Sequence, residues 1–167
     1  YLGADGLMHC TVCKEPVEAF YPKGSLLEMK KHHRQCACER QAYAEEAQYY
    51  KEKEHRELIA RNKKICFEEK EMEGFTFQNV ERDSGVIRIA EEYVTNWQKM
   101  KQNHMGYLFW GPVGTGKSYL AACIANALLE KEVTVKMTNF NTILNDLFAA
   151  EDKTEYIRLL NGYELLI

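Results

Sequence analysis

The chain has 167 residues, a formal net charge of −3, 46% hydrophobic residues and 28% charged residues. This length allows one complete domain, or one small domain with part of a second, and the apolar content allows a folded core. The charge excludes a basic signature for nucleic acid over the whole chain, and no apolar run is long enough to span a bilayer. We therefore expect a cytoplasmic protein that makes no contact with a membrane.

Residues 1–38 are predicted to form a small cysteine-rich, zinc-binding module. They contain the pairs Cys10-x-x-Cys13 and Cys36-x-Cys38 but only short apolar runs, so they cannot build a large core alone. Four thiolates are the donor set of a tetrahedral structural Zn²⁺ site, whose binding energy allows such a segment to fold. The predicted metal ligands are Cys10, Cys13, Cys36 and Cys38.

Other ligand sets and other cysteine chemistry stay open at this point. Because Cys-x-Cys is less usual than Cys-x-x-Cys, His9, His32 or His33 can replace one thiolate. An iron–sulfur cluster and a redox-active Cys-x-x-Cys pair are competing interpretations, although no strand–helix–strand pattern surrounds Cys10 to favour the second. No signal peptide is recognisable, which favours a reducing compartment over a disulfide framework. The two remaining cysteines are interpreted as packing residues.

Residues 39–73 are predicted to form a charged helical linker. About half of them are charged, with mixed signs, and no proline or glycine occurs before Gly74, which we expect to end the helix. Leu58 and Ile65 belong to a thin apolar stripe. A helix over residues 39–66 would be roughly 40 Å long at 1.5 Å per residue, enough to separate two modules. A surface helix that lies on its own domain fits the pattern equally well.

Residues 74–167 are predicted to form a layered α/β domain. Apolar residues recur at helical spacing in several segments, and Asn139 is a plausible N-cap. Helices are predicted at residues 84–102, 119–129, 140–150 and 155–160. Short apolar or alternating runs lie between and after these segments, and strands are predicted at residues 106–111, 133–137 and 163–167. Strands that alternate with helices through short connections favour a parallel sheet.

The sequence Gly-Pro-Val-Gly-Thr-Gly-Lys-Ser at residues 111–118 predicts a phosphate-binding loop. It lies between a predicted strand and a predicted helix, which is the context that this motif requires. Its three glycines allow the backbone to turn N–H groups toward phosphate oxygens, and the helix that follows adds its own free N–H groups. Lys117 would reach the β- and γ-phosphates of a nucleoside triphosphate, and the hydroxyl of Ser118 would bind Mg²⁺.

The residues predicted to bind the nucleotide are Gly111, Pro112, Val113, Gly114, Thr115, Gly116, Lys117, Ser118 and Tyr119. Among them, Lys117 is the predicted catalytic residue and Ser118 the predicted magnesium ligand. A glycine turn before a helix, without any nucleotide, is the purely structural alternative.

The loop and its surroundings resemble the ATPase domain of DnaC-type helicase loaders, which are AAA+ proteins of bacteria and their phages related to IstB-like transposase helpers. The resemblance rests on G-P-V-G-T-G-K-S-Y-L-A-A-C-I-A-N and the upstream F-T-F-Q-N, and it covers residues 75–167. It implies an incomplete AAA+-like P-loop NTPase domain that binds ATP and Mg²⁺. In this family the segment before the first strand helps to enclose the adenine, so Phe75, Phe77 and Val80 are candidates, with core packing as the alternative.

The resemblance also implies a role in DNA replication, in which ATP binding and hydrolysis are coupled to helicase loading on DNA. Some loaders of this family carry a cysteine-rich N-terminal module that contacts the helicase. The implied partners are a replicative DNA helicase and single-stranded DNA, together with homo-oligomers of the full-length protein. An IstB-like transposase helper and a nucleotide-binding scaffold protein without hydrolysis are the alternatives. Lys99, Lys101 and His104 form only a weak basic cluster, which we interpret as a solvated helix end.

Residues 163–167 match the apolar part of the strand that precedes the paired acids needed for hydrolysis in AAA+ proteins. Glu164 lies at the start of this strand and is therefore a poor substitute for those acids. From this resemblance we expect the chain to be a fragment of a longer ATPase that hydrolyses ATP inefficiently as given. We also expect its final apolar strand to favour aggregation.

Overall fold

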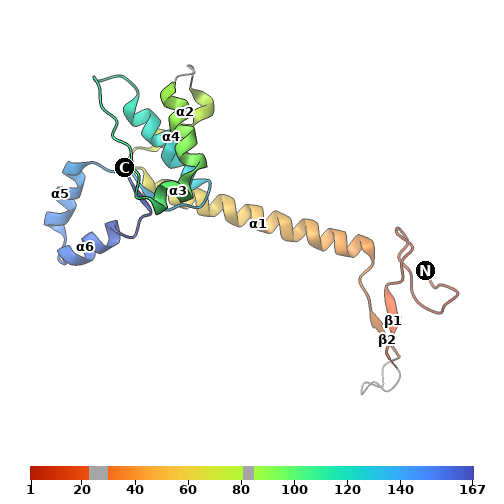
Figure 1. The fold of residues 1–167 in the computed structure, drawn as a ribbon. Helices are drawn as coiled ribbons and strands as arrows, with labels where there is room; N and C mark the ends of the chain where they lie inside the picture. The colour runs from red at the N-terminus through yellow and green to blue at the C-terminus, as the bar shows by residue number, and fades with distance from the viewer. Residues whose placement is uncertain (23–29, 81–84) are drawn as a thin grey trace. The chain divides into compact units, whose positions relative to one another are not determined.

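The computed structural model describes residues 1–22, 30–80 and 85–167 (Figure 1). The described residues form a mixed helix and strand fold with two small sheets of two strands each. Contacts divide the chain into two compact units, Tyr1–His55 and Arg56–Ile167.

The first unit contains a short antiparallel ribbon and very little core. Strand β1 (Glu18–Phe20) pairs with β2 (Lys31–His33). The ammonium group of Lys31 donates a hydrogen bond to the carbonyl of Gly6 (2.5 Å) and lies 3.3 Å from the carboxylate of Glu18. Among the described residues of this unit, Cys36 is the one hydrophobic residue that is fully buried. The predicted shortage of apolar contacts in this segment is therefore confirmed for its described residues.

Helix α1 (Ala37–Cys66) has 30 residues and contains the boundary between the two units. Its middle part is exposed to solvent, as the mixed charges predict. Side-chain hydrogen bonds from Gln41 to Glu45 and from Gln48 to Glu52 (both 2.8 Å) join successive turns on this exposed surface.

The prediction that this helix continues to Gly74 is wrong. Cys66 and Phe67 turn into the core of the second unit, where they are 0% and 6% exposed. The carbonyl of Cys66 accepts a hydrogen bond from the N–H of Met137 (3.1 Å), so it is paired with the residue that follows a strand. Because these contacts draw the chain away from the helix axis, α1 ends and the short 3₁₀ helix η1 (Lys70–Gly74) follows.

The predicted apolar stripe of α1 is also shifted. Ile65 is 48% exposed, whereas Ile59 is buried together with Cys66, seven residues further along. The buried face of the helix is therefore rotated by about one residue, or roughly 100°, from the predicted one. Periodicity alone could not place it because charged residues are interspersed with the apolar ones along the whole helix.

The core of the second unit forms around helix α4 (Lys117–Leu129), which packs against α2 (Gly85–Thr95). Most of α4 is buried, including Leu120, Ile124 and Leu128. An apolar helix that is covered on most sides belongs to the centre of a fold rather than to its surface. This burial fixes the position of the helix that follows the predicted phosphate loop.

Residues 84–102 were predicted as one helix, but the structure divides them into α2 and α3 (Trp97–Gln102). The break lies at Asn96, whose side-chain amide donates to the carbonyl of Glu92 (2.9 Å). Asparagine competes in this way with the backbone pairing of a helix interior. Ala90, Val94 and Trp97 are nevertheless all buried on one side of these two helices, and Ile87 is partly buried against the same core.

One buried amide attaches the segment after α1 to α4. Asn126 is 2% exposed, and its Nδ2 donates to the carbonyls of Met72 (2.8 Å) and Phe75 (2.9 Å). These bonds tie the backbone of that segment to the buried helix, and the Met72 carbonyl also accepts from the N–H of Phe75 (3.2 Å). The 3₁₀ helix η2 (Phe77–Asn79) follows directly.

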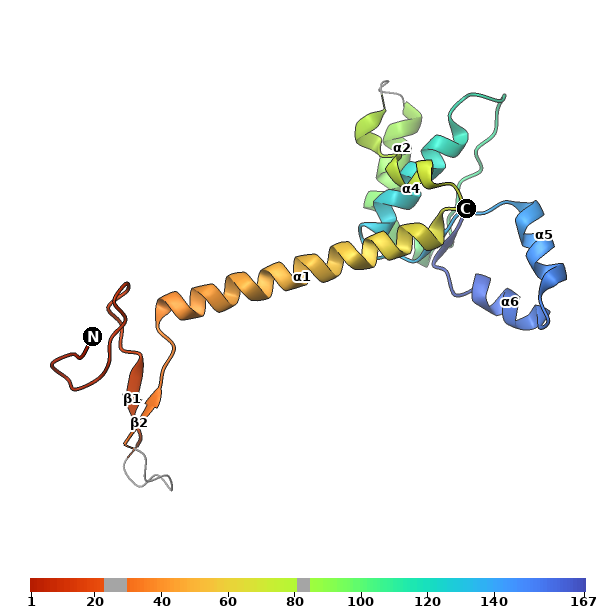
Figure 2. The ribbon, with the colours of Figure 1, turned by 180° about the vertical axis from the view of Figure 1, so that it is seen from behind.

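The second sheet consists of β3 (Val135–Lys136) and β4 (Leu165–Leu166), which pair in parallel. Both lie within the runs predicted as strands. Helices α5 (Phe140–Ala149) and α6 (Lys153–Leu160) form the connection between them and contact each other at a steep angle (Figure 2). The predicted cap is confirmed, because the side chain of Asn139 accepts a hydrogen bond from the N–H of Thr142 (2.9 Å).

The strand predicted at residues 106–111 is not formed. Leu108 and Trp110 are each 87% exposed, whereas Phe109 packs against the core. A strand buried on both faces needs a hydrogen-bonding neighbour within about 4.8 Å. Instead, an apolar cavity of about 130 Å³ is lined by Phe109 and by Leu165 and Ile167 at the end of the chain. The described residues supply no strand that pairs with this run.

An ion pair closes the start of β4. The carboxylate of Glu164 lies 2.5 Å from the ammonium of Lys101 and accepts a hydrogen bond from the N–H of Thr134 (3.2 Å). The hydrogen bond from Lys101 is the main reason that the pKa of Glu164 lies below its ordinary value of 4.5. This carboxylate therefore holds the strand in place from its start, which is the position that the sequence predicts for Glu164.

We predict that Glu164→Gln destabilises the second unit by up to about 1 kcal/mol at pH 7, the range measured for partly exposed pairs. A lowered carboxyl pKa stabilises the folded state above the unfolded pKa, and this contribution is lost as the pH falls through the folded pKa. The difference in unfolding free energy between parent and variant should therefore shrink below pH 4.5 and vanish in stronger acid. Urea unfolding at several pH values measures it. The exposed Glu151→Gln serves as the charge control, and an equal effect of both variants would contradict the assignment.

Candidate metal centre and phosphate-binding loop

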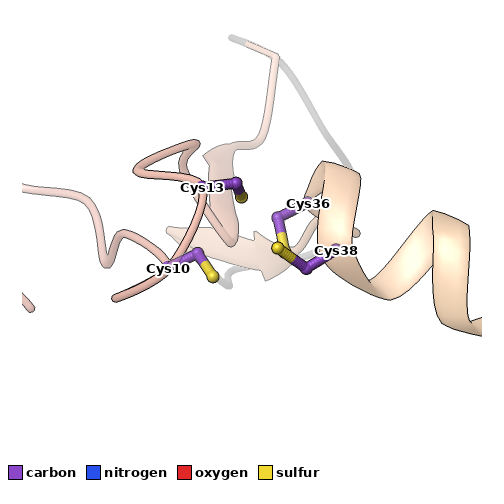
Figure 3. Close-up of side chains that lie close together, drawn as sticks. All are labelled: Cys10, Cys13, Cys36 and Cys38. Carbon is purple, nitrogen blue, oxygen red and sulfur yellow. The ribbon is translucent and has the colours of Figure 1, made fainter.

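The four predicted ligand cysteines converge at one place in the first unit (Figure 3). Cys10 and Cys13 come from the loop before β1, and Cys36 and Cys38 come from the start of α1. All four sulfur atoms lie within 4.8 Å of one another. Sulfur atoms around a tetrahedral Zn²⁺ are roughly 3.8 Å apart, given Zn–S bonds of about 2.3 Å. The cluster could therefore bind a metal ion such as zinc.

The backbone around the cluster favours thiolates. N–H groups of Glu15 and Cys38 point to the sulfur of Cys13 and lower the pKa of its thiol to about 6. The N–H of Val12 donates to the sulfur of Cys10 (3.4 Å). The Cys38 thiol is hydrogen-bonded to Cys13, which is the main reason that its pKa is raised to about 11. The hydrogen bonds thus favour the thiolate form of Cys13, and a bound cation would favour deprotonation of the other three thiols.

A carboxylate that the sequence did not single out joins the two halves of the cluster. Glu15 accepts hydrogen bonds from the N–H of Ala37 (2.7 Å) and from the guanidinium of Arg40 (3.1 Å). Glu15 follows Cys13 by two residues, and Ala37 lies between Cys36 and Cys38. The contact therefore fixes the distance between the two cysteine pairs. Only its position beside a ligand pair could have drawn attention to it.

We predict that Glu15→Ala lowers the affinity for Zn²⁺ about tenfold, at the lower end of the range for residues that support metal ligands. The variant keeps all four sulfur donors but loses the bonds that hold the two pairs together. Competition with a chromophoric chelator gives the affinity directly. Glu54→Ala, on the exposed part of α1, is the matched control, and equal affinities for the two variants would show that Glu15 does not support the site.

The three histidines that were alternatives to a thiolate lie outside the group of converging sulfur atoms. His9 is engaged through both ring nitrogens, with the carbonyl of Lys14 (2.9 Å) and the carboxylate of Asp5 (3.0 Å). These two contacts raise its pKa. His32 contacts the carbonyl of His33, whose own ring lies 3.4 Å from Glu39. Among the described residues, the converging ligand atoms are thus those of the four cysteines, without a histidine.

The predicted phosphate loop, residues 111–118, is an exposed turn in the second unit. Gly111, Gly114 and Gly116 have φ angles of 141°, 82° and 82°, a region that residues with a side chain rarely adopt. Gly116 is the N-cap of α4, and Lys117 is its first residue. The strand–loop–helix context is therefore present only in its second half, because the strand before the loop is not formed.

Lys117 folds back over the loop. Its ammonium group donates to the carbonyls of Gly111 (3.0 Å) and Pro112 (2.6 Å). Thr115 also donates to the carbonyl of Pro112 (2.9 Å), which tightens the turn. These contacts place a positive charge above the loop, at the N-terminal end of a buried helix, where the helix dipole also favours an anion.

The aromatic residues upstream of the loop are mainly packing residues. Phe75 and Phe77 are partly buried against the core, and the ring of Phe75 stacks on Tyr119 with centroids 4.5 Å apart. Tyr119 also donates a long hydrogen bond to the carbonyl of Thr76 (3.4 Å). The packing alternative is thus confirmed for both phenylalanines. Contact of these residues, or of Val80, with a base stays a prediction.

Two glutamates that the sequence gave no reason to select lie near the loop. A cavity of about 220 Å³ is lined by Ser118 together with Glu68 and Glu69 from the segment after α1. The carboxylate of Glu68 accepts a hydrogen bond from the hydroxyl of Thr138 (3.2 Å). These acids are about fifty residues from Ser118 in the sequence, so no local pattern could have found them.

Comparison with protein-family models, with curated proteins and with solved structures gives no match. Within residues 1–22, 30–80 and 85–167, no helix combines the length and the apolar character that crossing a bilayer requires. The arrangement of the residues described above is therefore the basis for any functional proposal.

Proposed function

We propose that the chain binds MgATP and acts as a DnaC-type helicase loader with a structural zinc site in its first unit. The observation that carries the nucleotide part is the loop with three glycines in positive-φ conformation, Gly111, Gly114 and Gly116, which leads directly into α4. This backbone suits the close approach of phosphate oxygens, and Lys117 adds the positive charge.

In this proposal, each residue of the loop has a distinct task. The backbone N–H groups of residues 113–117 surround the phosphates, and Lys117 releases its contacts with Gly111 and Pro112 to reach the β- and γ-phosphates. The hydroxyl of Ser118 binds Mg²⁺, a cation that prefers oxygen ligands. Tyr119, held by Phe75, borders the site on the helix side.

The zinc part of the proposal rests on the four converging sulfur atoms. A bound Zn²⁺ supplies folding energy and no catalysis, because four protein ligands leave no open coordination position. The lowered pKa of Cys13 favours the thiolate that a metal needs. The hydrogen bonds of Glu15 hold the two cysteine pairs at a fixed distance. All six cysteines are free thiols, which agrees with the cytoplasmic location included in the proposal.

The partner in this proposal is a replicative helicase, which the first unit contacts. Single-stranded DNA and further copies of the protein belong to the same proposal. Support for these partners comes from the resemblance of residues 75–167 to the loader family and from the separate compact unit that carries the cysteines.

Calorimetric titration of the zinc-loaded chain tests the nucleotide part. With Mg²⁺ present, ATP is expected to bind at least tenfold more tightly than adenosine, because most of the predicted contacts go to phosphates. Pyrophosphate should compete with ATP for the same reason. Equal affinity for ATP and adenosine, or no binding of either, would contradict the proposed function.

A further inference from the structure

The Cys-x-x-Cys pair of the cluster lies in one turn at the surface of the first unit. The N–H of Cys10 donates to the carbonyl of Glu15 (2.8 Å), and the N–H of Val12 donates to the sulfur of Cys10 (3.4 Å). Val12 is 76% exposed, and Cys10 and Cys13 are both partly exposed. A small reagent in solution can therefore reach these two sulfur atoms.

The other two cysteines are held by the start of α1. Cys36 is 1% exposed and directly precedes this helix, and Cys38 is its second residue. The N–H of Cys36 donates to the carboxylate of Glu39 (3.2 Å), and the carbonyl of Cys36 accepts from the N–H of Arg40 (3.0 Å). A backbone shift at either cysteine would therefore break hydrogen bonds at the start of a 30-residue helix.

This difference selects the pair of sulfur atoms that can join. Sulfur atoms that share one Zn²⁺ are roughly 3.8 Å apart, whereas a disulfide bond is about 2.05 Å long. Two sulfur atoms of the cluster must therefore approach each other by about 1.8 Å to form a disulfide. Residues 11–13 form a turn outside the helices and strands, which can make this adjustment more easily than a helix can. Cys10 and Cys13 are thus the pair best placed to form a disulfide.

The first unit has little besides the cluster to keep it ordered. Strands β1 and β2 pair over three residues each, and a two-stranded ribbon is marginally stable alone. Cys36 is the one fully buried hydrophobic residue among those described in this unit. Loss of two ligands would leave two thiolates, which bind zinc far more weakly than four. The oxidation state of one cysteine pair can therefore decide whether the unit stays folded.

We propose that Cys10 and Cys13 form a redox switch, in which hydrogen peroxide joins them in a disulfide, the metal is released and the first unit unfolds. This inference rests on the zinc part of the proposed function. Disulfides of this kind in a reducing compartment are transient and act as redox sensors. In the proposed function the first unit contacts the helicase, so oxidation would weaken that contact.

The oxidation proceeds in two balanced steps. The sulfur of one cysteine attacks a peroxide oxygen, so that an S–O bond forms, the O–O bond breaks and hydroxide leaves. The sulfur of the second cysteine then attacks the first sulfur, an S–S bond forms and the S–O bond breaks, with loss of a second hydroxide. Both hydroxides take a proton from the solvent. The two thiolates lose two electrons, and one peroxide becomes two water molecules.

Peroxide treatment of the zinc-loaded chain tests the switch. A chromophoric chelator should record the release of about one zinc per chain. Peptide mapping should find Cys10 joined to Cys13, whereas Cys66 and Cys123, both 0% exposed, should stay reduced. Amide signals of the first unit should disappear while those of the second unit remain. Dithiothreitol with added Zn²⁺ should restore the lost signals.

Two variants that keep four metal ligands provide the matched comparison. Zn²⁺ accepts a histidine in place of a cysteine, so Cys10→His and Cys38→His each retain a complete ligand set. Peroxide should release zinc from Cys10→His about tenfold more slowly than from the parent, because the second sulfur of the pair is missing. Cys38→His keeps the pair and should release zinc as fast as the parent does.

The outcomes distinguish this inference from the zinc assignment. A zinc-loaded parent that keeps its metal in peroxide, or a disulfide that includes Cys36 or Cys38, overturns the switch and leaves the zinc site intact. Equal rates of zinc release from the two variants also overturn it. If a variant does not bind zinc, the disulfide mapped in the parent decides. A parent chain without zinc overturns both the switch and the zinc part of the proposed function.

Discussion

Lys117→Ala is expected to lower the affinity of the chain for MgATP about 100-fold. The variant removes the ammonium group that would approach the β- and γ-phosphates, and charge-assisted hydrogen bonds of this kind contribute about 1.5–3 kcal/mol each. A tenfold loss of affinity corresponds to about 1.4 kcal/mol, so the loss of two such bonds accounts for the expected change. Displacement of a fluorescent ATP analogue measures it.

The fold should tolerate this change. In the structure, Lys117 contacts the carbonyls of Gly111 and Pro112 within an exposed loop, so its loss does not open the core. Lys99→Ala, which removes an exposed lysine of α3, is the control for the change in net charge. If both variants bind ATP as the parent does, residues 111–118 are only a glycine turn before a helix.

The second large effect is expected from Cys13→Ser. The variant loses the sulfur that two backbone N–H groups hold closest to the thiolate state, and a tetrahedral site with three thiolates binds zinc far more weakly. Elemental analysis should fall from about one zinc per chain to nearly none. The first unit should then lose its ordered structure, because Cys36 is its one fully buried hydrophobic residue among those described.

The two units separate the possible outcomes of this experiment. Amide signals of the second unit should be unchanged in Cys13→Ser, because its core lies around α4 and contains none of the four clustered cysteines. Val12→Ala, at an exposed position in the same loop, should keep the metal. A parent protein that contains no metal when purified without chelators would refute the zinc assignment.

The elements with strong local signals could be predicted from the sequence. Helix α4 and the cap at Asn139 were correct because an apolar run after glycines and an asparagine before a helix depend on neighbouring residues only. The cysteine cluster was predictable because close ligand pairs leave few alternatives for a segment without a core. Each of these features is encoded within a short stretch of the chain.

The features that sequence reasoning missed depend on contacts between distant segments. The strand at residues 106–111 needs a partner strand, and α1 ends where Cys66 meets Met137, about seventy residues later. Likewise, Glu15 reaches Ala37, and Glu68 reaches the cavity of Ser118. Apolar content and periodicity carry no information on these pairings, so only the folded structure could reveal them.

The complete burial of Cys66 and Cys123 gives this chain two classes of thiol. Both side chains are 0% exposed, and burial raises the pKa of each thiol to about 11. A thiol-specific dye at neutral pH reacts with thiolates that it can reach, so it leaves these two cysteines unlabelled while the fold is intact. Among the other four, Cys10, Cys13 and Cys38 are partly exposed and Cys36 is buried, and a metal ion bound at this cluster would shield all four sulfur atoms. The number of labelled cysteines per chain, from none to four, therefore reports how much of the cluster lacks metal. A fifth or sixth label shows that the core around α4 has opened.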